Sequence, residues 1–195
     1  HFKKNHPRIK VNVFIKNSKR VVDLLNSGNI DLGLVEGEIQ KQKIKVEPLI
    51  TDELAIIIPP FHPWAKKKVV SILEITKEPF ILREEGSGTR QMIEKYLSAH
   101  GINTSDMLIA LVLGSTESIK EAVEGGMGVS ILSRWAAKKE LKYGSLKMVS
   151  IKEEKILRNF SLILPKNSVL SHTVEEFLSY LKTFPYDNLL ADGRV

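Results

Sequence analysis

Short apolar runs alternate with amphipathic stretches in the first part of the chain. Residues 11–15 alternate and carry β-branched and aromatic side chains, so their pattern predicts a strand. Apolar residues then recur at helical spacing between Ser18, a candidate N-cap, and Gly28, a candidate stop. Residues 30–37 predict a second short buried strand. A strand, a helix and a strand at this spacing predict a βαβ unit with a right-handed crossover, and hence a parallel sheet.

The middle of the chain continues this alternation. Residues 53–58 predict a strand that ends at Pro59 and Pro60, which cannot continue a ladder. Residues 78–82 predict a further strand. A polar, glycine-rich loop over 83–90 follows it and opens a helix that ends at Gly101.

The same order of elements returns in the last half and suggests a second lobe. The pattern predicts strands at 108–113, 129–132 and 160–164, an extended segment at 146–151, and helices at 119–123, at 135–141 and from Thr173 to Pro185. The sequence Thr-Val-Glu-Glu at Thr173 resembles a capping box.

Composition is that of an ordinary globular protein. The 195 residues are 43% hydrophobic and 27% charged, so a disordered or fibrous chain is a poor interpretation. The absence of cysteine excludes disulfides, thiol catalysis and cysteine-based zinc sites, and fits a cytoplasmic location. No apolar run is long enough to span a bilayer, so we expect no membrane partner. Because residue 1 is His rather than Met, we expect the chain to be a fragment of a longer protein.

The net charge of +6 suits an anionic partner, either nucleic acid or a small acid, without choosing between them. The five histidines show no spacing typical of metal ligands, so we predict no metal site and no cofactor. Ser87 and Ser115 lack the surroundings of a nucleophile, since no G-x-S-x-G motif is present. We therefore predict no catalytic residue and no enzyme activity.

Three polar turns stand where a predicted strand is followed by a predicted helix. They lie at residues 17–18, 85–90 and 114–116. Free amides and the helix dipole favour an anion at such positions, and ligands of open α/β sheets bind beyond the carboxyl ends of the strands. The turn at 85–90 matches neither a P-loop nor a dinucleotide-binding fingerprint. Each turn alone is better explained as a helix cap, and for the three together a set of caps and a pocket for one small ligand stay equal alternatives.

Taken in order, the motifs of nearly the whole chain resemble those of one family, the effector-binding domain of LysR-type transcriptional regulators. The matching segments are His6-Pro7 with the strand at Val11, residues 24–34, residues 56–60 with His62-Pro63, Phe80-Ile81 with residues 86–90, residues 118–120 with Val123 and residues 125–129, and residues 144–146. The glycine-rich loop looks like that of regulators of sulfur or nitrogen metabolism.

The resemblance implies a two-lobed α/β fold, the type 2 periplasmic-binding-protein fold, with two crossing segments near residues 84–86 and 155–159. Residues 1–84 and 158–195 would form lobe I, and residues 85–157 lobe II. It further implies a winged helix-turn-helix domain that precedes this chain, together with a strand and the start of a helix before His6.

The resemblance also implies an effector site in the cleft between the lobes. Carried over to this chain, its contacting turns fall on Asn17, Ser18, Ser87, Gly88, Thr89, Arg90, Ser115 and Thr116. Glu36 ends its strand at the same cleft, where it would either accept a hydrogen bond from a ligand amine or remain a solvated carboxylate. Arg90 would either line the cleft or form only a surface ion pair.

The expected function is that of a sensing domain that binds a small anionic metabolite and thereby controls DNA binding by the full-length regulator. We expect a homodimer or homotetramer, with DNA contacted only through the absent domain. The alternative is a solute-binding receptor of a transporter, which shares the fold and would carry a signal peptide or lipid anchor upstream. An enzyme on this scaffold would need a catalytic constellation in the cleft.

Overall fold

The computed structural model describes residues 1–39, 43–166 and 169–186, and within them a mixed α/β fold. The helices are α1 (Phe2–Asn5), α2 (Ser18–Asn26), α3 (Ile72–Ile75), α4 (Gly88–Ala99), α5 (Thr116–Glu124), α6 (Lys138–Tyr143) and α7 (His172–Thr183), with 3-10 turns at Pro63–Lys66 and Thr104–Asp106. The strands are β1 (Gly33–Glu36), β2 (Ile44–Ile58), β3 (Val69–Val70), β4 (Phe80–Arg83), β5 (Ile109–Leu113), β6 (Ser130–Ser133), β7 (Lys147–Ile151) and β8 (Ile156–Pro165).

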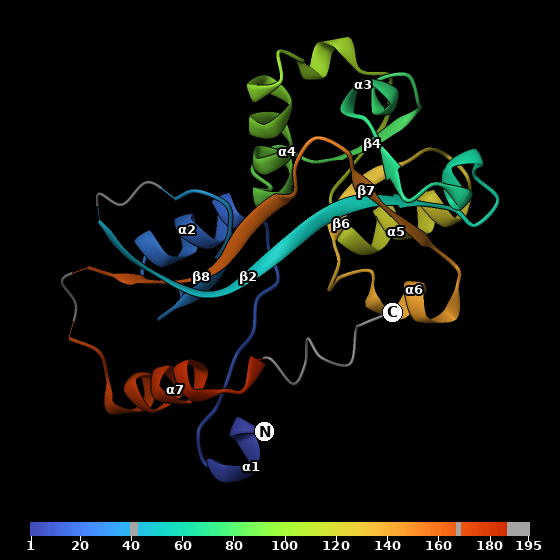
Figure 1. Ribbon diagram of the computed structural model, residues 1–195. Helices are drawn as coiled ribbons and strands as arrows, with labels where there is room; N and C mark the ends of the chain where they lie inside the picture. The colour runs from blue at the N-terminus through green and yellow to red at the C-terminus, as the bar shows by residue number, and fades with distance from the viewer. Residues whose placement is uncertain (40–42, 167–168, 187–195) are drawn as a thin grey trace.

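Two long antiparallel strands, β2 and β8, run through the centre of the fold. They pair from Ile44 with Pro165 to Leu54 with Ile156. β1 adds to the other edge of β8, whereas the last part of β2 pairs with β6 and β7. Figure 1 shows that β2 and β8 run from the half that holds α2 and α7 into the half that holds α3 and α5. The two halves therefore share these two strands.

Buried aliphatic side chains of β2 hold the second half together. Ile56 and Ile58 pack with Phe80 of β4, Leu97 of α4 and Ile131 of β6 in one cluster. Ile57, on the opposite face of β2, packs with a second cluster around α5 and β6. Because successive residues of a strand point to opposite faces, this apolar run is covered by helices on both sides.

The predicted crossing at 155–159 falls on the start of β8, and β2 is a second strand that runs through both halves. The first half of β2 is polar, and for this reason the sequence pattern predicted only its apolar end, residues 53–58. Residues of β2, β3 and β4 pack in one core with α4 and β7. The crossing at residues 84–86 and the lobe boundaries after residues 84 and 157 stay predictions.

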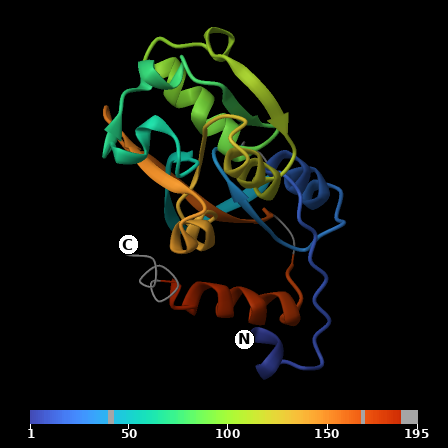
Figure 2. The same ribbon diagram turned by 90° about the vertical axis from the view of Figure 1, so that its right-hand side faces the viewer.

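The predicted strand at residues 11–15 is wrong. This segment belongs to no ladder in the described part of the chain, and Val13 and Ile15 are 77% and 91% exposed. Figure 2 shows it as an extended segment that connects α1, which lies beside α7, with the start of α2. Alternation alone does not make a strand, because a strand also needs a neighbour to accept its hydrogen bonds. The predicted βαβ unit is therefore not formed, and β1 instead pairs antiparallel with β8.

Three helix starts differ by a few residues from the prediction. Asn17, and not Ser18, caps α2 by accepting from the amide of Arg20 at 3.0 Å. Ser171, and not Thr173, caps α7. The helix predicted at 135–141 begins at Lys138, after a turn over residues 134–137. Parallel pairing does occur, between β3 and β7 and between β4 and β5.

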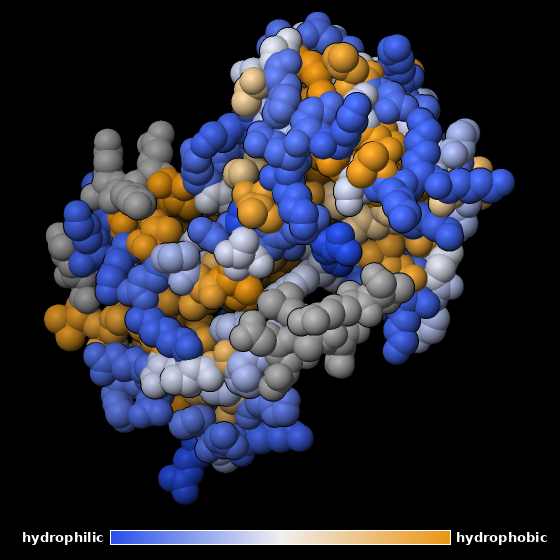
Figure 3. Space-filling model, viewed as in Figure 1, coloured by the Kyte–Doolittle hydropathy of each residue, from blue (hydrophilic) through white to orange (hydrophobic). Residues whose placement is uncertain are grey.

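None of the described helices is both long and apolar enough to traverse a lipid bilayer. Figure 3 shows hydrophilic side chains over much of one face, with hydrophobic side chains visible between them.

Candidate functional site

A chain of side-chain hydrogen bonds joins the predicted turns at residues 17–18 and 114–116 through the end of β4. Asn17 donates through Nδ2 to Glu84 Oε1 at 3.1 Å, Glu84 pairs with Arg83 at 2.8 Å, and Arg83 Nη1 donates to Thr116 Oγ1 at 2.9 Å. Burial acts to raise the pKa of Glu84, but the bonds from Arg83 and Asn17 outweigh it and the pKa is lowered. An ionised Glu84 therefore joins the start of α2 to Arg83 of β4, and Arg83 in turn contacts α5.

Several of the predicted ligand contacts are occupied as helix caps. The side-chain oxygens of Asn17, Ser87 and Ser115 accept from the amides three residues onward, at 3.0, 3.4 and 3.1 Å. Arg90 forms an ion pair with Glu94 one turn along α4, at 2.7 Å. For these four residues the structure supports the capping and ion-pair alternatives that the sequence left open.

The end of β1 is fixed between the starts of α2 and α4. Ser18 Oγ donates to the carbonyl of Glu36 at 3.0 Å, and the amide of Glu36 lies 3.2 Å from the same oxygen. Gly88, the first residue of α4, approaches so closely that a Cβ atom on it would stand 2.1 Å from the carbonyl oxygen of Glu36. The missing side chain of Gly88 therefore sets the spacing between β1 and α4.

Gly88→Ala is expected to lower the free energy of unfolding by about 1–3 kcal/mol, because the added methyl group forces β1 and α4 apart. Gly114→Ala is the matched control, since Gly114 also lies near the start of a helix but has open space where the added methyl group would stand. Urea denaturation of the two variants measures the difference. Equal stabilities would show that this close approach is unimportant.

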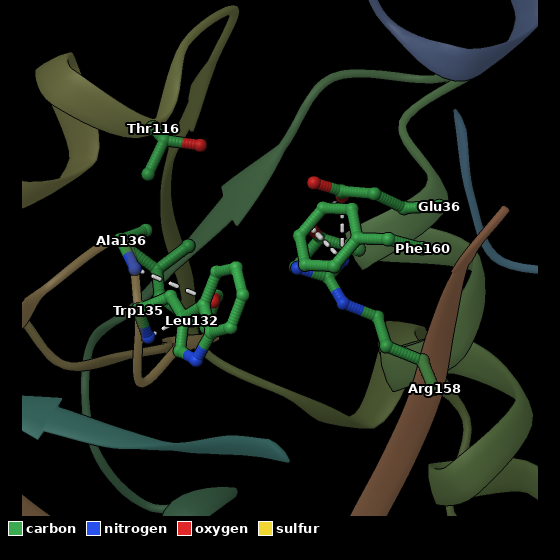
Figure 4. Close-up of a pocket in the computed structure, with 9 residues that line it drawn as sticks. Glu36, Thr116, Leu132, Trp135, Ala136, Arg158 and Phe160 are labelled. Carbon is green, nitrogen blue, oxygen red and sulfur yellow. Dashed lines mark hydrogen bonds and ion pairs between the residues drawn. The ribbon is translucent and has the colours of Figure 1, made fainter. Parts of the chain in front are cut away.

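A cavity of about 260 Å³ lies beside these turns (Figure 4). Its lining residues are Glu36, Thr89, Thr116, Leu132, Ser133, Trp135, Ala136, Arg158 and Phe160. Of the predicted site residues, only Glu36, Thr89 and Thr116 are among them. Ser18, Ser87, Gly88 and Arg90 line a second cavity, of about 680 Å³, with Glu38 and Glu94. Asn17 and Ser115 line neither cavity.

A buried arginine dominates the first cavity. Arg158, on β8, has a side chain that is only 2% exposed, and its Nε donates to Asp52 Oδ2 of β2 at 2.9 Å. Its Nη1 donates to Glu36 Oε2 at 2.5 Å and to Thr89 Oγ1 at 2.8 Å. Nη2 has no hydrogen-bond partner among the described residues. One guanidinium thus joins the two long strands to β1 and α4, and retains a free donor beside the cavity.

Asp52 is the inner partner of this arginine. Its side chain is fully buried, and Ser133 Oγ donates to its Oδ1 at 2.9 Å. Burial raises the pKa of Asp52, against the opposing effects of Arg158 and Ser133. Two neighbouring groups therefore offset part of the cost of burying this carboxylate.

Two aromatic rings form the apolar part of the cavity. The ring centroid of Phe160 lies 5.1 Å from Cζ of Arg158 and 6.0 Å from the ring of Trp135, at an interplanar angle of 26°. In Figure 4, Trp135, Ala136 and Thr116 lie on one side of the cavity, and Glu36, Phe160 and Arg158 lie on the other. The site therefore offers a cation, hydroxyl groups and aromatic surface, a combination typical of small-ligand pockets.

Asp52, Arg158, Trp135 and Phe160 are not among the residues that the sequence predicts for the site. Asp52 and Arg158 lie just before the apolar runs at residues 53–58 and 160–164, so the pattern gave only the weak signal of a charge next to a predicted strand. Charges in such positions are buried only when they are paired.

The turn that carries Trp135 is held by a nearly buried lysine. Lys120 of α5 donates through Nζ to the carbonyl of Ala136 at 3.1 Å and to Glu140 of α6 at 2.8 Å. Burial acts to raise the pKa of Glu140, but the hydrogen bond from Lys120 outweighs it and the pKa is lowered. Lys120 thus fixes one wall of the cavity.

This pair predicts a pH dependence of stability. Because the pKa of Glu140 is lower in the folded than in the unfolded chain, its contribution is present above the ordinary value of 4.5 and is lost as the pH falls below it. Glu140→Gln should therefore show a smaller loss of unfolding free energy between pH 6 and pH 3 than the parent chain. Parallel pH profiles for the two proteins would contradict the assignment.

In the part of the chain that the structure describes, no cluster of three or more histidine, aspartate or glutamate side chains is arranged to hold a metal ion.

The arrangement defines a class of protein, namely a two-lobed α/β binding domain of the type 2 periplasmic-binding-protein kind. The model of the LysR substrate binding domain matches residues 1–184. The chain therefore belongs to the LysR family, as the sequence motifs predicted.

The relatives are regulators of transcription. The chain is 32% identical over 187 residues to the HTH-type transcriptional regulator CysL of Bacillus subtilis, covering 96% of this chain and 62% of CysL. It is 32% identical over 194 residues to a probable RuBisCO transcriptional regulator of Cyanidium caldarium, covering 96% of this chain and 61% of that protein. The chain thus spans about three fifths of the length of these curated relatives.

Solved structures agree with this assignment. The regulatory domain of Synechocystis PCC6803 CcmR in complex with 2-PG is 30% identical, with a TM-score of 0.83 over 93% of this chain and 86% of that one. The effector binding domain of QuiR in complex with shikimate has the same TM-score at 22% identity, over 95% of this chain and 87% of that one, and shows the shared fold. The family comprises regulators rather than enzymes, so neither the enzyme nor the transporter-receptor alternative is favoured.

Proposed function

We propose that this domain senses a small anionic metabolite in the cavity lined by Arg158, Thr89, Thr116 and Trp135. The observation that carries the proposal is the free Nη2 of a buried arginine beside a cavity with two aromatic rings. A guanidinium in a partly dry site forms strong hydrogen bonds to carboxylate, phosphate or sulfate. The complex of CcmR with 2-PG supports a small ligand for this class of domain.

The predicted site residues divide into two groups by their proposed role. Glu36, Thr89 and Thr116 would lie in the effector cavity itself. Asn17, Ser18, Ser87, Gly88, Arg90 and Ser115 would act indirectly, by fixing the helix starts and the end of β1 around it. No cofactor is proposed.

The proposed role in the full-length protein is to couple effector binding to transcription. The family places the DNA-binding activity in a separate winged helix-turn-helix domain, and we propose the same for this protein, in a cytoplasmic homodimer or homotetramer. Sedimentation of the domain tests its self-association, and a monomer at high micromolar concentration would count against it.

A thermal-shift panel tests the ligand class. The panel contains sulfate, phosphate, 2-PG, O-acetylserine and small dicarboxylates, with neutral sugars as controls. An anion that binds only the folded state stabilises it by about 2.7 kcal/mol at a hundredfold excess over Kd, which gives a shift of several degrees. Thr116→Val should remove most of that shift, because it loses one hydroxyl of the cavity wall. A full response in this variant, or shifts with neutral compounds only, would refute the proposal.

A further inference from the structure

Glu36 occupies the best anion-binding position of the cavity. Its Oε2 accepts from Thr89 Oγ1 at 3.0 Å and from Arg158 Nη1 at 2.5 Å, although its side chain is still 30% exposed. A hydroxyl and a guanidinium N–H that converge on one point form the donor set that a ligand carboxylate or sulfate would use. The protein's own carboxylate holds those donors.

The charge balance supports the same interpretation. Arg158 carries one positive charge and has two carboxylates within hydrogen-bond distance, those of Asp52 and Glu36. Asp52 is fully buried and holds Nε, so Arg158 needs it to remain paired. Glu36 is the partly exposed partner, and its loss would leave a neutral Arg158–Asp52 pair with Nη1 and Nη2 both directed at the cavity.

The geometry leaves Glu36 free to move while its backbone stays fixed. Its carbonyl and amide are both held by Ser18 Oγ, and Gly88 packs against the same carbonyl. The side-chain bonds to Thr89 and Arg158 are therefore separable from the anchoring of β1. A rotation of the Glu36 side chain releases two donors without disturbing the strand.

We propose that Glu36 is an internal counter-anion, which an anionic effector displaces from Thr89 and Arg158 when it binds. The inference rests on the proposed function and adds a specificity device to it. Weak anions that lack further contacts fail to compete with Glu36, whereas a ligand that also stacks on Trp135 and Phe160 succeeds. Glu36 thus sets a threshold of affinity and selects ligands with both an anionic group and a body that fits the aromatic wall.

The test compares the binding of sulfate and malonate to the parent chain, Glu36→Gln and Glu36→Ala, by calorimetry at pH 7.5 and constant ionic strength. Both variants should bind these anions at least tenfold more tightly than the parent chain. Glu38→Gln is the matched control, because Glu38 is two residues away and exposed, and pairs with Lys95 rather than Arg158. It should change the affinity less than twofold.

Two results would overturn the inference. One is that the Glu36 variants bind sulfate and malonate no more tightly than the parent chain. The other is that Glu38→Gln tightens binding equally, which would indicate a general field effect. If the neutral variants fold poorly, Glu36→Asp provides a second test, because it keeps the charge but is too short to reach Thr89 and Arg158. It too should bind sulfate and malonate more tightly than the parent chain. The panel of anions on the parent chain tests the proposed function separately.

Discussion

Replacing Arg158 by methionine is expected to lower the free energy of unfolding by about 3–5 kcal/mol. Methionine fills a similar volume but leaves Asp52 as a fully buried carboxylate with Ser133 as its remaining hydrogen-bond donor. It also removes the links from β8 to Glu36 and Thr89. Urea denaturation monitored by circular dichroism measures the loss.

The control for this prediction is the double variant Asp52→Asn with Arg158→Met. Neutralising Asp52 removes the uncompensated charge, so the double variant should recover a substantial part of the lost stability. A single variant that loses less than about 1 kcal/mol would show that the network contributes little. A double variant less stable than the single one would show that Asp52 is not the cause.

The second large effect concerns recognition. Trp135→Ala is expected to weaken binding of the anion that gives the largest thermal shift by about thirtyfold or more, which corresponds to about 2 kcal/mol. The indole forms the aromatic wall with Phe160, and its removal leaves the ligand exposed to water on that side. Isothermal titration calorimetry provides the comparison.

Trp135→Phe is the matched variant, since it keeps an aromatic ring on the same turn. It should retain most of the affinity. Unchanged binding by Trp135→Ala would place the ligand outside this cavity, for example in the cavity that Glu38 and Glu94 line.

The sequence predicted the elements best where the hydrophobic pattern is local. The strands at residues 80–83 and 109–113 follow from short apolar runs, and the capped starts of α4 and α5 follow from Ser87 and Ser115 and from the glycines beside them. These features depend on neighbours within a few residues. The family resemblance likewise rests on the order of such local motifs.

The hydrophobic pattern could not predict which strands pair over long distances in the sequence. Residues 11–15 alternate as well as any strand in the chain, but they have no ladder partner in the described structure. β2 was predicted at less than half its length, because its first half pairs with β8 through alternating polar residues. Whether such a segment becomes a strand depends on a partner that is distant in sequence.

In the site, too, local features could be predicted and long-range contacts could not. Turn residues such as Thr89 and Thr116 could be predicted from their positions at helix starts. The pairing of Asp52 with Arg158 joins residues 106 apart, and the stacking of Trp135 on Phe160 depends on how a turn meets a strand. No spacing rule links those residues, so the main cation of the cavity was not predicted.

The chain offers one direct test of where the effector binds, because it has two tryptophans. Trp135 lines the cavity, whereas Trp64 is buried in the core beside His62. Their indole N–H groups give two separate signals in a ¹H–¹⁵N NMR spectrum, which Trp64→Phe assigns. During titration with the best anion of the panel, we predict a saturable shift of the Trp135 signal with the Trp64 signal unchanged. Saturable binding that leaves the Trp135 signal in place would contradict the account.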